Sequence, residues 1–266
     1  MRIETSHESP ISILDKSLQY NDYCYALVHL FETHEKYFDF FKQAINNNVE
    51  VYLDNSIFEL KESFDPDKYA EWIEKLQPNL YIVPDVLEDS TGTVNNWIDW
   101  ENKHKFDNIR KMGVVQGRTW TDLVDCYRFM SQAADMIAIS FDYSYYQGTG
   151  FGRTTLQRYS NGRQRFIQQL IQEGIWCWDK PHHLLGCSLA REFRYYVDHD
   201  IHNIKSVDTS NPIVAAMHQM RYNDEHGLDT KPKTLLADMI DHEVTDDEQE
   251  LIDYNTSMFK KILRRY

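Results

Sequence analysis

Residues 204–210 read Ile-Lys-Ser-Val-Asp-Thr-Ser, an apolar strand-like run that ends with the carboxylate of Asp208. Two earlier runs end in the same way, Val51-Tyr52-Leu53-Asp54 and Tyr81-Ile82-Val83-Pro84-Asp85. In a barrel of parallel strands, the residues at the C-terminal ends of the strands meet at one mouth. The repeated pattern therefore predicts a barrel with a site at one opening.

Short apolar runs alternate with amphipathic stretches, a pattern typical of repeated βα units around a parallel sheet. Eight strands are predicted, over residues 2–5, 24–30, 50–54, 80–85, 111–116, 136–141, 183–187 and 205–209. The helices predicted between them cover residues 36–46, 67–76, 94–103, 121–132, 163–173, 191–198 and 213–220. Eight strands in about 250 residues match the size of a (β/α)8 barrel. We therefore predict the α/β class and a TIM-type barrel.

A single domain is expected for residues 1–266. A chain of 266 residues with 42% hydrophobic content can bury most of its apolar surface in one core. Glycine and proline are sparse, and no low-complexity linker divides the chain. Residues 246–263 have a helical pattern, so residues 221–266 are expected to form a closing helical segment.

The sequence indicates a cytoplasmic protein without a membrane partner. It contains no apolar run long enough to span a bilayer, and residues 1–7 lack the apolar stretch of a secretion signal. The cysteines have no CxxC spacing, so neither a disulfide framework nor a thiolate metal site is predicted. The adjacent His182 and His183 would point to opposite faces of a strand without acidic partners at ligand spacing, so packing is expected rather than metal binding.

The formal net charge of −14 opposes nonspecific binding to a polyanion, because phosphate binding normally draws on a surplus of Lys and Arg. Any contact with nucleic acid must therefore be local. Two basic clusters are candidates: Arg153, Arg158, Arg163 and Arg165 around Tyr159 and Asn161, and Lys260, Lys261, Arg264 and Arg265. A solvated helical face is the alternative interpretation, and it is favoured for either cluster taken singly.

Polar residues at the predicted strand ends form the candidate site: Asp54, Asp85, Gln116, residues 140–142, residues 186–188 and Asp208. Two carboxylates that face one pocket can have different roles in one reaction. One attacks or stabilises a cationic sugar carbon, while the other moves a proton at a pKa raised by burial and by its neighbour. Gln116 offers a donor and an acceptor for the edge of a base, and Phe58 offers a flat face for stacking.

Each candidate also has a plain alternative. Asp54-Asn55 could simply end a strand in a turn, and Asp208 could belong to an ordinary helix entry before Pro212. Gln116 could be a polar strand end that contacts only water. The order in which these residues occur together favours the functional interpretation over these separate explanations.

Five short motifs carry a family resemblance: Val51-Tyr52-Leu53-Asp54-Asn55-Ser56-Ile57-Phe58, Val83-Pro84-Asp85, Gly113-Val114-Val115-Gln116-Gly117, His183-Leu184-Leu185-Gly186 and Ser206-Val207-Asp208-Thr209-Ser210. In this order they resemble the successive strand ends of tRNA-guanine transglycosylases, and residues 113–117 are nearly the GIVQG of that family. The resemblance spans about residues 2–220, and only the ordered set is specific. The short, acidic form is similar to phage and bacterial relatives that insert 7-deazaguanines into DNA, which implies the host cytoplasm if a phage encodes the chain.

The resemblance implies a pentosyltransferase that works by double displacement. Asp208 would attack the sugar C1′, and Asp54 would be the general acid/base. Guanine leaves, a glycosyl-enzyme forms at the aspartate, and a 7-deazaguanine attacks in its place. Asp85 and Gln116 would hydrogen-bond the purine edge while Phe58 stacks on its face. The expected substrate-binding set is completed by other strand-end residues, Gly117, Ser140 and Gly186.

The partners implied by the resemblance are a nucleic acid and a free 7-deazaguanine or purine base, with no cofactor and no metal. Family members that act on tRNA usually carry a C-x-C-x-x-C and a later His for structural zinc, but this chain has no cysteine after Asp208. The barrel is therefore expected without the zinc subdomain, and DNA is favoured over tRNA. The family is often dimeric, so a homodimer is left open.

Two further departures affect the substrate more than the reaction class. Ile139-Ser140-Phe141-Asp142-Tyr143 stands where the family typically has a glycine pair and a leucine, so a bulkier lining could change which base is accepted. Asn55-Ser56-Ile57 replaces the usual Ser-Gly-Gly, which could alter how closely the backbone approaches a ligand.

Two alternatives to transglycosylation stay open. Water could finish the glycosyl intermediate on the same carboxylate pair, giving a base-releasing N-glycosidase or a nucleoside hydrolase. A barrel that binds a nucleobase or a partner protein without turnover would be favoured if Asp54 and Asp208 lay far apart.

Overall fold

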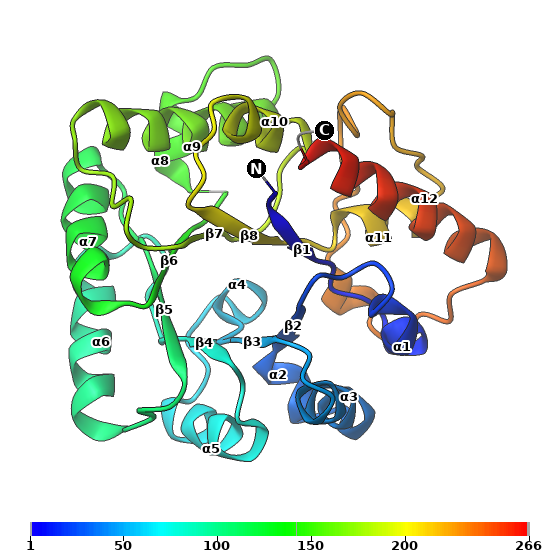
Figure 1. Ribbon diagram of the computed structural model, residues 1–266, viewed down its shortest axis with the longest axis horizontal. Coiled ribbons are helices and arrows are strands. Elements are labelled where there is room, and N and C mark those ends of the chain that lie inside the picture. Colours follow the sequence, from blue (N-terminus) through cyan, green and yellow to red (C-terminus); the bar gives the residue numbers. More distant parts are fainter. Residues whose placement is uncertain (1, 142, 265–266) are drawn as a thin grey trace.

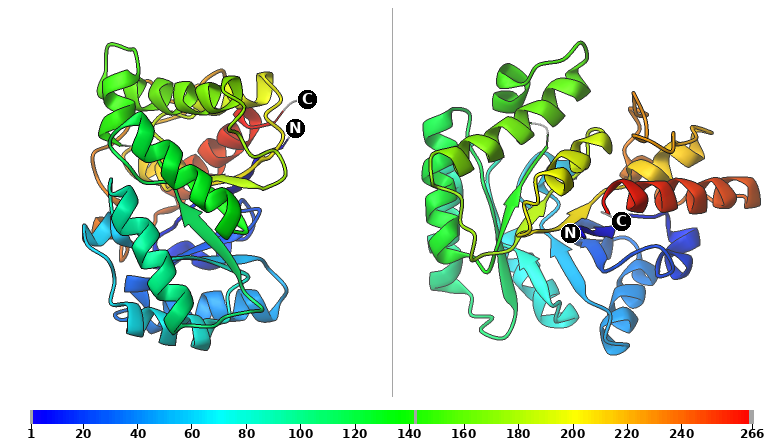
Figure 2. Two further views of the ribbon diagram at one scale, coloured as in Figure 1. Left: turned by 90° about the vertical axis from the view of Figure 1, so that its left-hand side faces the viewer. Right: turned by 45° about the horizontal axis from the view of Figure 1, so that its top comes forward.

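Eight parallel strands form a nearly closed barrel ringed by helices, in a computed structural model that describes residues 2–141 and 143–264 (Figure 1). The two further views agree that the helices lie outside the strands (Figure 2). The predicted (β/α)8 TIM-type barrel is thus confirmed. The strands are β1 (Glu4–Ser6), β2 (Cys24–Leu27), β3 (Val51–Asp54), β4 (Leu80–Ile82), β5 (Arg110–Val114), β6 (Met136–Ile139), β7 (His182–Leu184) and β8 (Ile204–Asp208).

The helices between and after the strands differ widely in length. The longer ones are α3 (Glu35–Asn46), α5 (Pro66–Leu76), α6 (Ser90–Lys103), α7 (Trp120–Ala133), α9 (Thr155–Gln172), α10 (Arg191–Asp198) and α12 (Asp246–Ile262). The shorter ones are η1 (Ile11–Ile13), α1 (Leu14–Ser17), α2 (Val28–Phe31), α4 (Ile57–Leu60), α8 (Ser144–Thr149), α11 (Asn211–Met217) and η2 (Leu236–Met239).

The strands pair in the order β1-β8-β7-β6-β5-β4-β3-β2, and every ladder is parallel. At the seam between β1 and β2, the Asp22 N–H donates to the Thr5 carbonyl at 2.8 Å. The Asp22 carboxylate also contacts Arg2, Lys260 and Arg264, so it ties the start of β1 to the end of α12. The two ends of the described chain accordingly lie side by side (Figures 1 and 2).

The predicted strand over residues 24–30 is too long, because β2 ends at Leu27 and α2 begins at Val28. Val28, Leu30 and Phe31 are buried as helix residues just as they would be in a strand. A short apolar run has no periodicity that distinguishes these two states.

Helix starts follow local capping chemistry. Asp65 accepts hydrogen bonds from the Asp67 and Lys68 amides with Pro66 next to it, and Thr119 caps α7 in a reciprocal pair with Asp122. Helix α9 begins at Thr155 rather than at residue 163, because Thr154 and Gln157 form another capping box. The two residues of this capping box are three positions apart, so the helix start is encoded locally in the sequence.

The main core joins the buried strands to the inner faces of the surrounding helices. A second cluster, which includes Ile13, Ile213, Leu236 and Ile252, packs η1, α11, η2 and α12 together. Residues 218–235 form turns and loops rather than a helix, so η2 and α12 supply the helical part of the described segment 218–264. In the part of the chain that the structure describes, no helix combines the length and apolar character needed to cross a membrane.

Candidate active site

A cavity of about 470 Å³ opens at the C-terminal ends of the strands. It is lined by most of the residues predicted for the site: Asp54, Phe58, Asp85, Gln116, Ser140, Gly186 and Asp208. Small-molecule sites commonly have volumes of roughly 300–1,000 Å³, so a nucleobase and part of a sugar can fit. Gly117 is not in the lining. A Cβ at Gly117 would lie 2.8 Å from the Leu123 nitrogen, so this glycine lets the segment that follows β5 approach the first turn of α7.

Asp208 ends β8 with its side chain toward the cavity and 6% of the residue exposed. Its Oδ1 atom accepts from the Gly186 N–H at 3.1 Å and lies 2.8 Å from His183 Nε2. Ser206 Oγ lies 2.8 Å from His183 Nδ1. If the carboxylate is the acceptor, His183 donates from Nε2, and the Ser206 hydroxyl donates to Nδ1. These contacts fix the orientation of the Asp208 carboxylate, which is the candidate nucleophile.

His183 is buried against the rings of Tyr23, Tyr25 and Tyr52, as expected for a packing role, and it also makes a polar contact that the sequence did not indicate. The two histidines of β7 point to opposite faces, as predicted: His182 stacks on Trp176 and contacts the Tyr127 hydroxyl, while His183 reaches Asp208. The β7–β8 ladder shifts register between His182 and His183. Such irregularities redirect side chains and are frequent beside active sites. The sequence contains no signal for this shift.

Asp54 ends β3 and lines the same cavity. Its Oδ1 accepts from the Ser56 N–H at 2.5 Å, and its Oδ2 accepts from the Tyr25 hydroxyl. Burial raises the pKa of Asp54 well above its ordinary value, and the charges of Glu59 and Asp208 add to this, while the two donors oppose it. Ser56 has φ 60°, a left-handed conformation that glycine adopts more readily than serine.

Tyr25 connects the two acids. Its hydroxyl holds Asp54, and its ring stacks on the His183 ring with centroids 5.8 Å apart and planes 10° apart. His183 in turn contacts Asp208. Residues from β2, β3, β7 and β8 therefore build one polar unit across the barrel mouth.

Two further carboxylates were missed in the sequence. Glu8 follows β1 and Glu59 lies in α4, and both line the cavity. Desolvation raises the pKa of Glu8 well above its ordinary value, and the charges of Asp208, Glu59 and Asp54 raise it further, as does a side-chain hydrogen bond to Asp208. The strand-end rule that selected the aspartates also applies to Glu8, two residues beyond β1.

Asp85 lies in a separate network of neutral amides. Its Oδ1 accepts from Asn55 Nδ2 at 2.7 Å, and its Oδ2 accepts from Gln116 Nε2 at 2.5 Å. Gln116 Oε1 accepts from the Glu88 N–H at 2.7 Å. Burial raises the pKa of Asp85, and the two amide donors oppose this shift. Asp85 and Gln116 therefore order each other at the cavity wall.

Aromatic and basic side chains complete the lining. The Phe58 and Phe141 rings lie 6.2 Å apart, with Lys61 over the first and Lys231 over the second. Phe141 is also the residue that a Cβ on Gly186 would meet, at 2.5 Å. Residues 230–237 reach the cavity from the segment after α11 and bring Lys231 and Lys233 to its lining. Asp142, from the predicted 140–142 segment, lies outside the described residues.

The predicted basic clusters are only partly available to a phosphate backbone. Arg163 is fully buried in an ion pair with Glu192, which contradicts its expected place on an exposed basic patch. Lys260 and Arg264 are engaged with Asp22, and Arg265 lies outside the described residues. Lys231 and Lys233 line the cavity, whereas none of the described residues of either cluster does.

A TIM-type barrel supports many unrelated reactions, so the fold alone does not identify the chemistry. No protein-family model matches this chain, and a search of curated proteins finds no match either. The geometry of the cavity is therefore the basis for any statement about what the protein does.

Proposed function

We propose that the protein is a transglycosylase that exchanges guanine for a 7-deazaguanine base in nucleic acid, with DNA favoured over tRNA. One observation carries the proposal: Asp54 and Asp208, from strands far apart in the sequence, line one cavity. This is the arrangement that a nucleophile and a proton-transferring partner require around a sugar ring. A non-catalytic barrel would be favoured by two acids lying far apart, whereas their common cavity supports the enzymatic proposal.

The proposed first step forms a covalent intermediate. An Asp208 oxygen attacks C1′ of the sugar, and the C1′–N9 bond to guanine breaks. The electron pair left on the base takes a proton, which Asp54 supplies because its raised pKa favours the protonated form. The Gly186 N–H and His183 hold Asp208 in position for the attack.

The second step returns the enzyme to its starting state. Asp54, now a carboxylate, removes the proton from the ring nitrogen of the incoming 7-deazaguanine. That nitrogen attacks C1′, and the ester bond to Asp208 breaks. Asp54 keeps the proton, so atoms and charges balance without a cofactor.

Base recognition is assigned to the other wall of the cavity. Asp85 and Gln116, ordered by each other and by Asn55, present polar atoms to a purine edge, and Phe58 offers a stacking face. Lys231 and Lys233 can neutralise phosphates next to the cavity. A free 7-deazaguanine or purine base and a nucleic acid are thus the proposed partners. A cytoplasmic location and a homodimer stay predictions.

The test combines base exchange with trapping of the intermediate. The protein is incubated with radiolabelled guanine and either duplex DNA or tRNA, and the products are separated under denaturing conditions. We expect label in DNA and a protein–DNA adduct, both lost in Asp208→Asn on the order of 10⁴-fold or more. Asp107→Asn, an exposed carboxylate before β5, is the matched control and should behave as wild type.

Other outcomes separate the alternatives. Net release of guanine without incorporation would assign the base-releasing glycosidase. Label in tRNA alone would reverse the polymer preference. Neither exchange, release nor adduct with either polymer would refute the proposed enzyme.

A further inference from the structure

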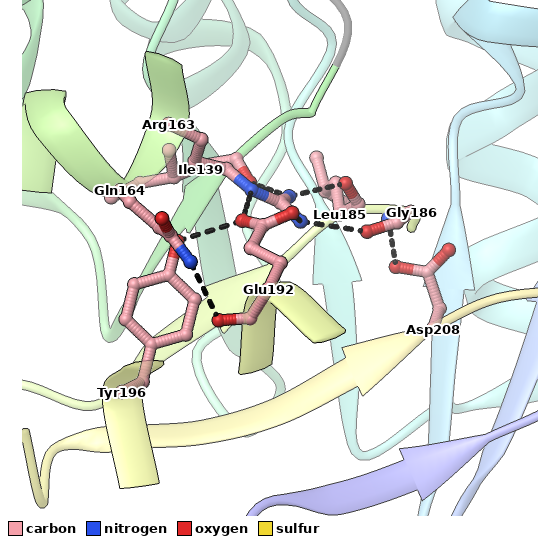
Figure 3. A network of polar contacts seen from close by, with 8 residues as sticks. All are labelled: Ile139, Arg163, Gln164, Leu185, Gly186, Glu192, Tyr196 and Asp208. Carbon is pink, nitrogen blue, oxygen red and sulfur yellow. Dashed lines mark hydrogen bonds and ion pairs between the residues drawn. The ribbon is translucent and has the colours of Figure 1, made fainter. Parts of the chain in front are cut away.

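Arg163 is a fully buried arginine whose five N–H donors are all used (Figure 3). Nε and Nη2 donate to the two Glu192 carboxylate oxygens at 2.6 and 3.1 Å. Nη1 donates to the Ile139 carbonyl at 3.1 Å and to the Leu185 carbonyl at 2.9 Å, and Nη2 donates to the Gly186 carbonyl at 3.1 Å. One guanidinium thus joins the end of β6 to the segment that follows β7.

The carbonyl of Leu185 and the N–H of Gly186 belong to the same peptide unit. In a planar trans peptide these two groups point in opposite directions. The carbonyl of this unit accepts from Arg163, while its N–H donates to Asp208 Oδ1 at 3.1 Å. Figure 3 shows this series of contacts from the arginine through the peptide to the aspartate.

Arg163 also holds the next peptide unit through the Gly186 carbonyl. Gly186 has φ +65°, a conformation that glycine adopts without strain but does not fix by itself, so the Arg163 contacts hold the orientation of its two flanking peptides. A cation on the carbonyl also polarises the peptide and strengthens the hydrogen bond that its N–H donates.

Stability alone is a weak explanation for this ion pair. Burying two charges costs several kcal/mol, and well-packed apolar residues of similar volume often stabilise a core as well or better. Glu192 further requires the Tyr196 hydroxyl, at 2.7 Å from Oε1. What a packed apolar side chain could not supply is a set of donors aimed at three specific backbone carbonyls.

We propose that Arg163 is a positioning residue that orients Asp208 through the Leu185–Gly186 peptide, with Glu192 and Tyr196 holding the guanidinium. This role rests on the proposed function for its effect on rate. The geometric link itself is independent of any reaction.

The first measurement needs no activity. The Gly186 amide resonance is followed by ¹H–¹⁵N NMR of deuterated protein, because a hydrogen bond to a carboxylate moves an amide proton downfield. Asp208→Asn and Arg163→Lys, which replaces five fixed donors by three, should both move this resonance upfield. Arg128→Lys, on the exposed surface of α7, is the control and should leave it unchanged.

The second measurement is the single-turnover rate of adduct formation. Arg163→Lys should lower this rate about 10- to 100-fold, while the KM for guanine, measured separately in steady-state base exchange, changes little because the base wall of the cavity is untouched. If Arg163→Lys does not fold, Tyr196→Phe removes only one support of Glu192 and should give smaller changes in the same direction.

A folded Arg163→Lys or Tyr196→Phe variant with an unchanged Gly186 resonance would overturn the positioning role. So would a rate loss accompanied by an equal rise in KM. A wild-type protein that forms no adduct, but whose Gly186 resonance responds to both Asp208→Asn and Arg163→Lys, would retain the link and refute the proposed enzyme.

Discussion

The two sides of the barrel mouth hold their acids in different ways. At the ends of β3 to β5, Asp85 is held by the neutral amides of Asn55 and Gln116. At the ends of β6 to β8, Asp208 is held by a histidine and by a backbone N–H that a buried ion pair supports. Neutral amides can serve a carboxyl group in either protonation state, whereas a fixed cation imposes one geometry. The first side suits recognition of a base, and the second suits a group that must attack along one direction.

Breaking the ion pair should have the largest effect on stability. Arg163→Met leaves the Glu192 carboxylate buried, with the Tyr196 hydroxyl as its hydrogen-bond donor among the residues that the structure describes, so we expect a loss of about 3–5 kcal/mol in the free energy of unfolding. Gln116→Leu, on the amide side, should cost about 1–3 kcal/mol, because it removes one neutral partner from Asp85 and one from the Glu88 amide. Urea denaturation followed by circular dichroism measures both. Equal losses would remove the distinction between the two sides.

A substitution in the backbone that supports Asp208 should have an intermediate effect on stability. Gly186→Ala places a Cβ 2.5 Å from the Phe141 ring at a residue with positive φ, so it should destabilise the protein by about 1–3 kcal/mol. Gly148→Ala is a matched control in α8, where a Cβ meets nothing within 4 Å, and it should be neutral or stabilising by about 0.5–1 kcal/mol. Thermal unfolding of the two variants gives the comparison. A neutral Gly186→Ala would show that the peptide tolerates rearrangement.

The smallest expected effect is a pH-dependent change in folding stability caused by Glu8. Because the pKa of Glu8 is raised in the folded state, the unfolded chain loses this proton first as pH rises above about 4.5, and folding stability falls until the folded pKa is passed. Glu8→Gln removes this penalty, so the variant should match wild type near pH 4 and gain about 1 kcal/mol by pH 8.

The control for this pH effect lies on the other side of the mouth. Asp85→Asn should lower stability overall although the pKa of Asp85 is also raised by burial, because an amide cannot accept from both Asn55 and Gln116 as the carboxylate does. Urea titrations at several pH values test the difference. A gain for Glu8→Gln that is the same at every pH would contradict the electrostatic cause.

Much of the barrel could be predicted because its signals are local. Buried strands read as short apolar runs, and the Asp65 and Thr119 caps are set by residues within one turn. Where the sequence carries no such local signal, the predicted element bounds are wrong. The run at residues 24–30 is apolar throughout, so nothing in it marked the change from β2 to α2 at Val28.

The residues of the candidate site likewise fall into those that a local sequence signal marks and those that it does not. Asp54, Asp85 and Asp208 could be selected because the C-terminal ends of parallel strands meet at one mouth, whatever their separation in sequence. Glu8 was missed because β1 is short and polar, although the same rule covers it. Arg163 looked like a surface charge, since its neighbours in the sequence are basic and polar.

The sequence by itself determined the alternation of strands and helices, and with it the convergence of three aspartates, because chain direction and hydrophobic pattern are properties of consecutive residues. Only the tertiary structure decided that His183 turns inward, that residues 230–237 reach the cavity, and that Arg163 meets Glu192 and three carbonyls beneath Asp208. Each of these depends on contacts between distant segments. Their free energy comes from desolvation and hydrogen-bond geometry, which exist only once those segments are packed together.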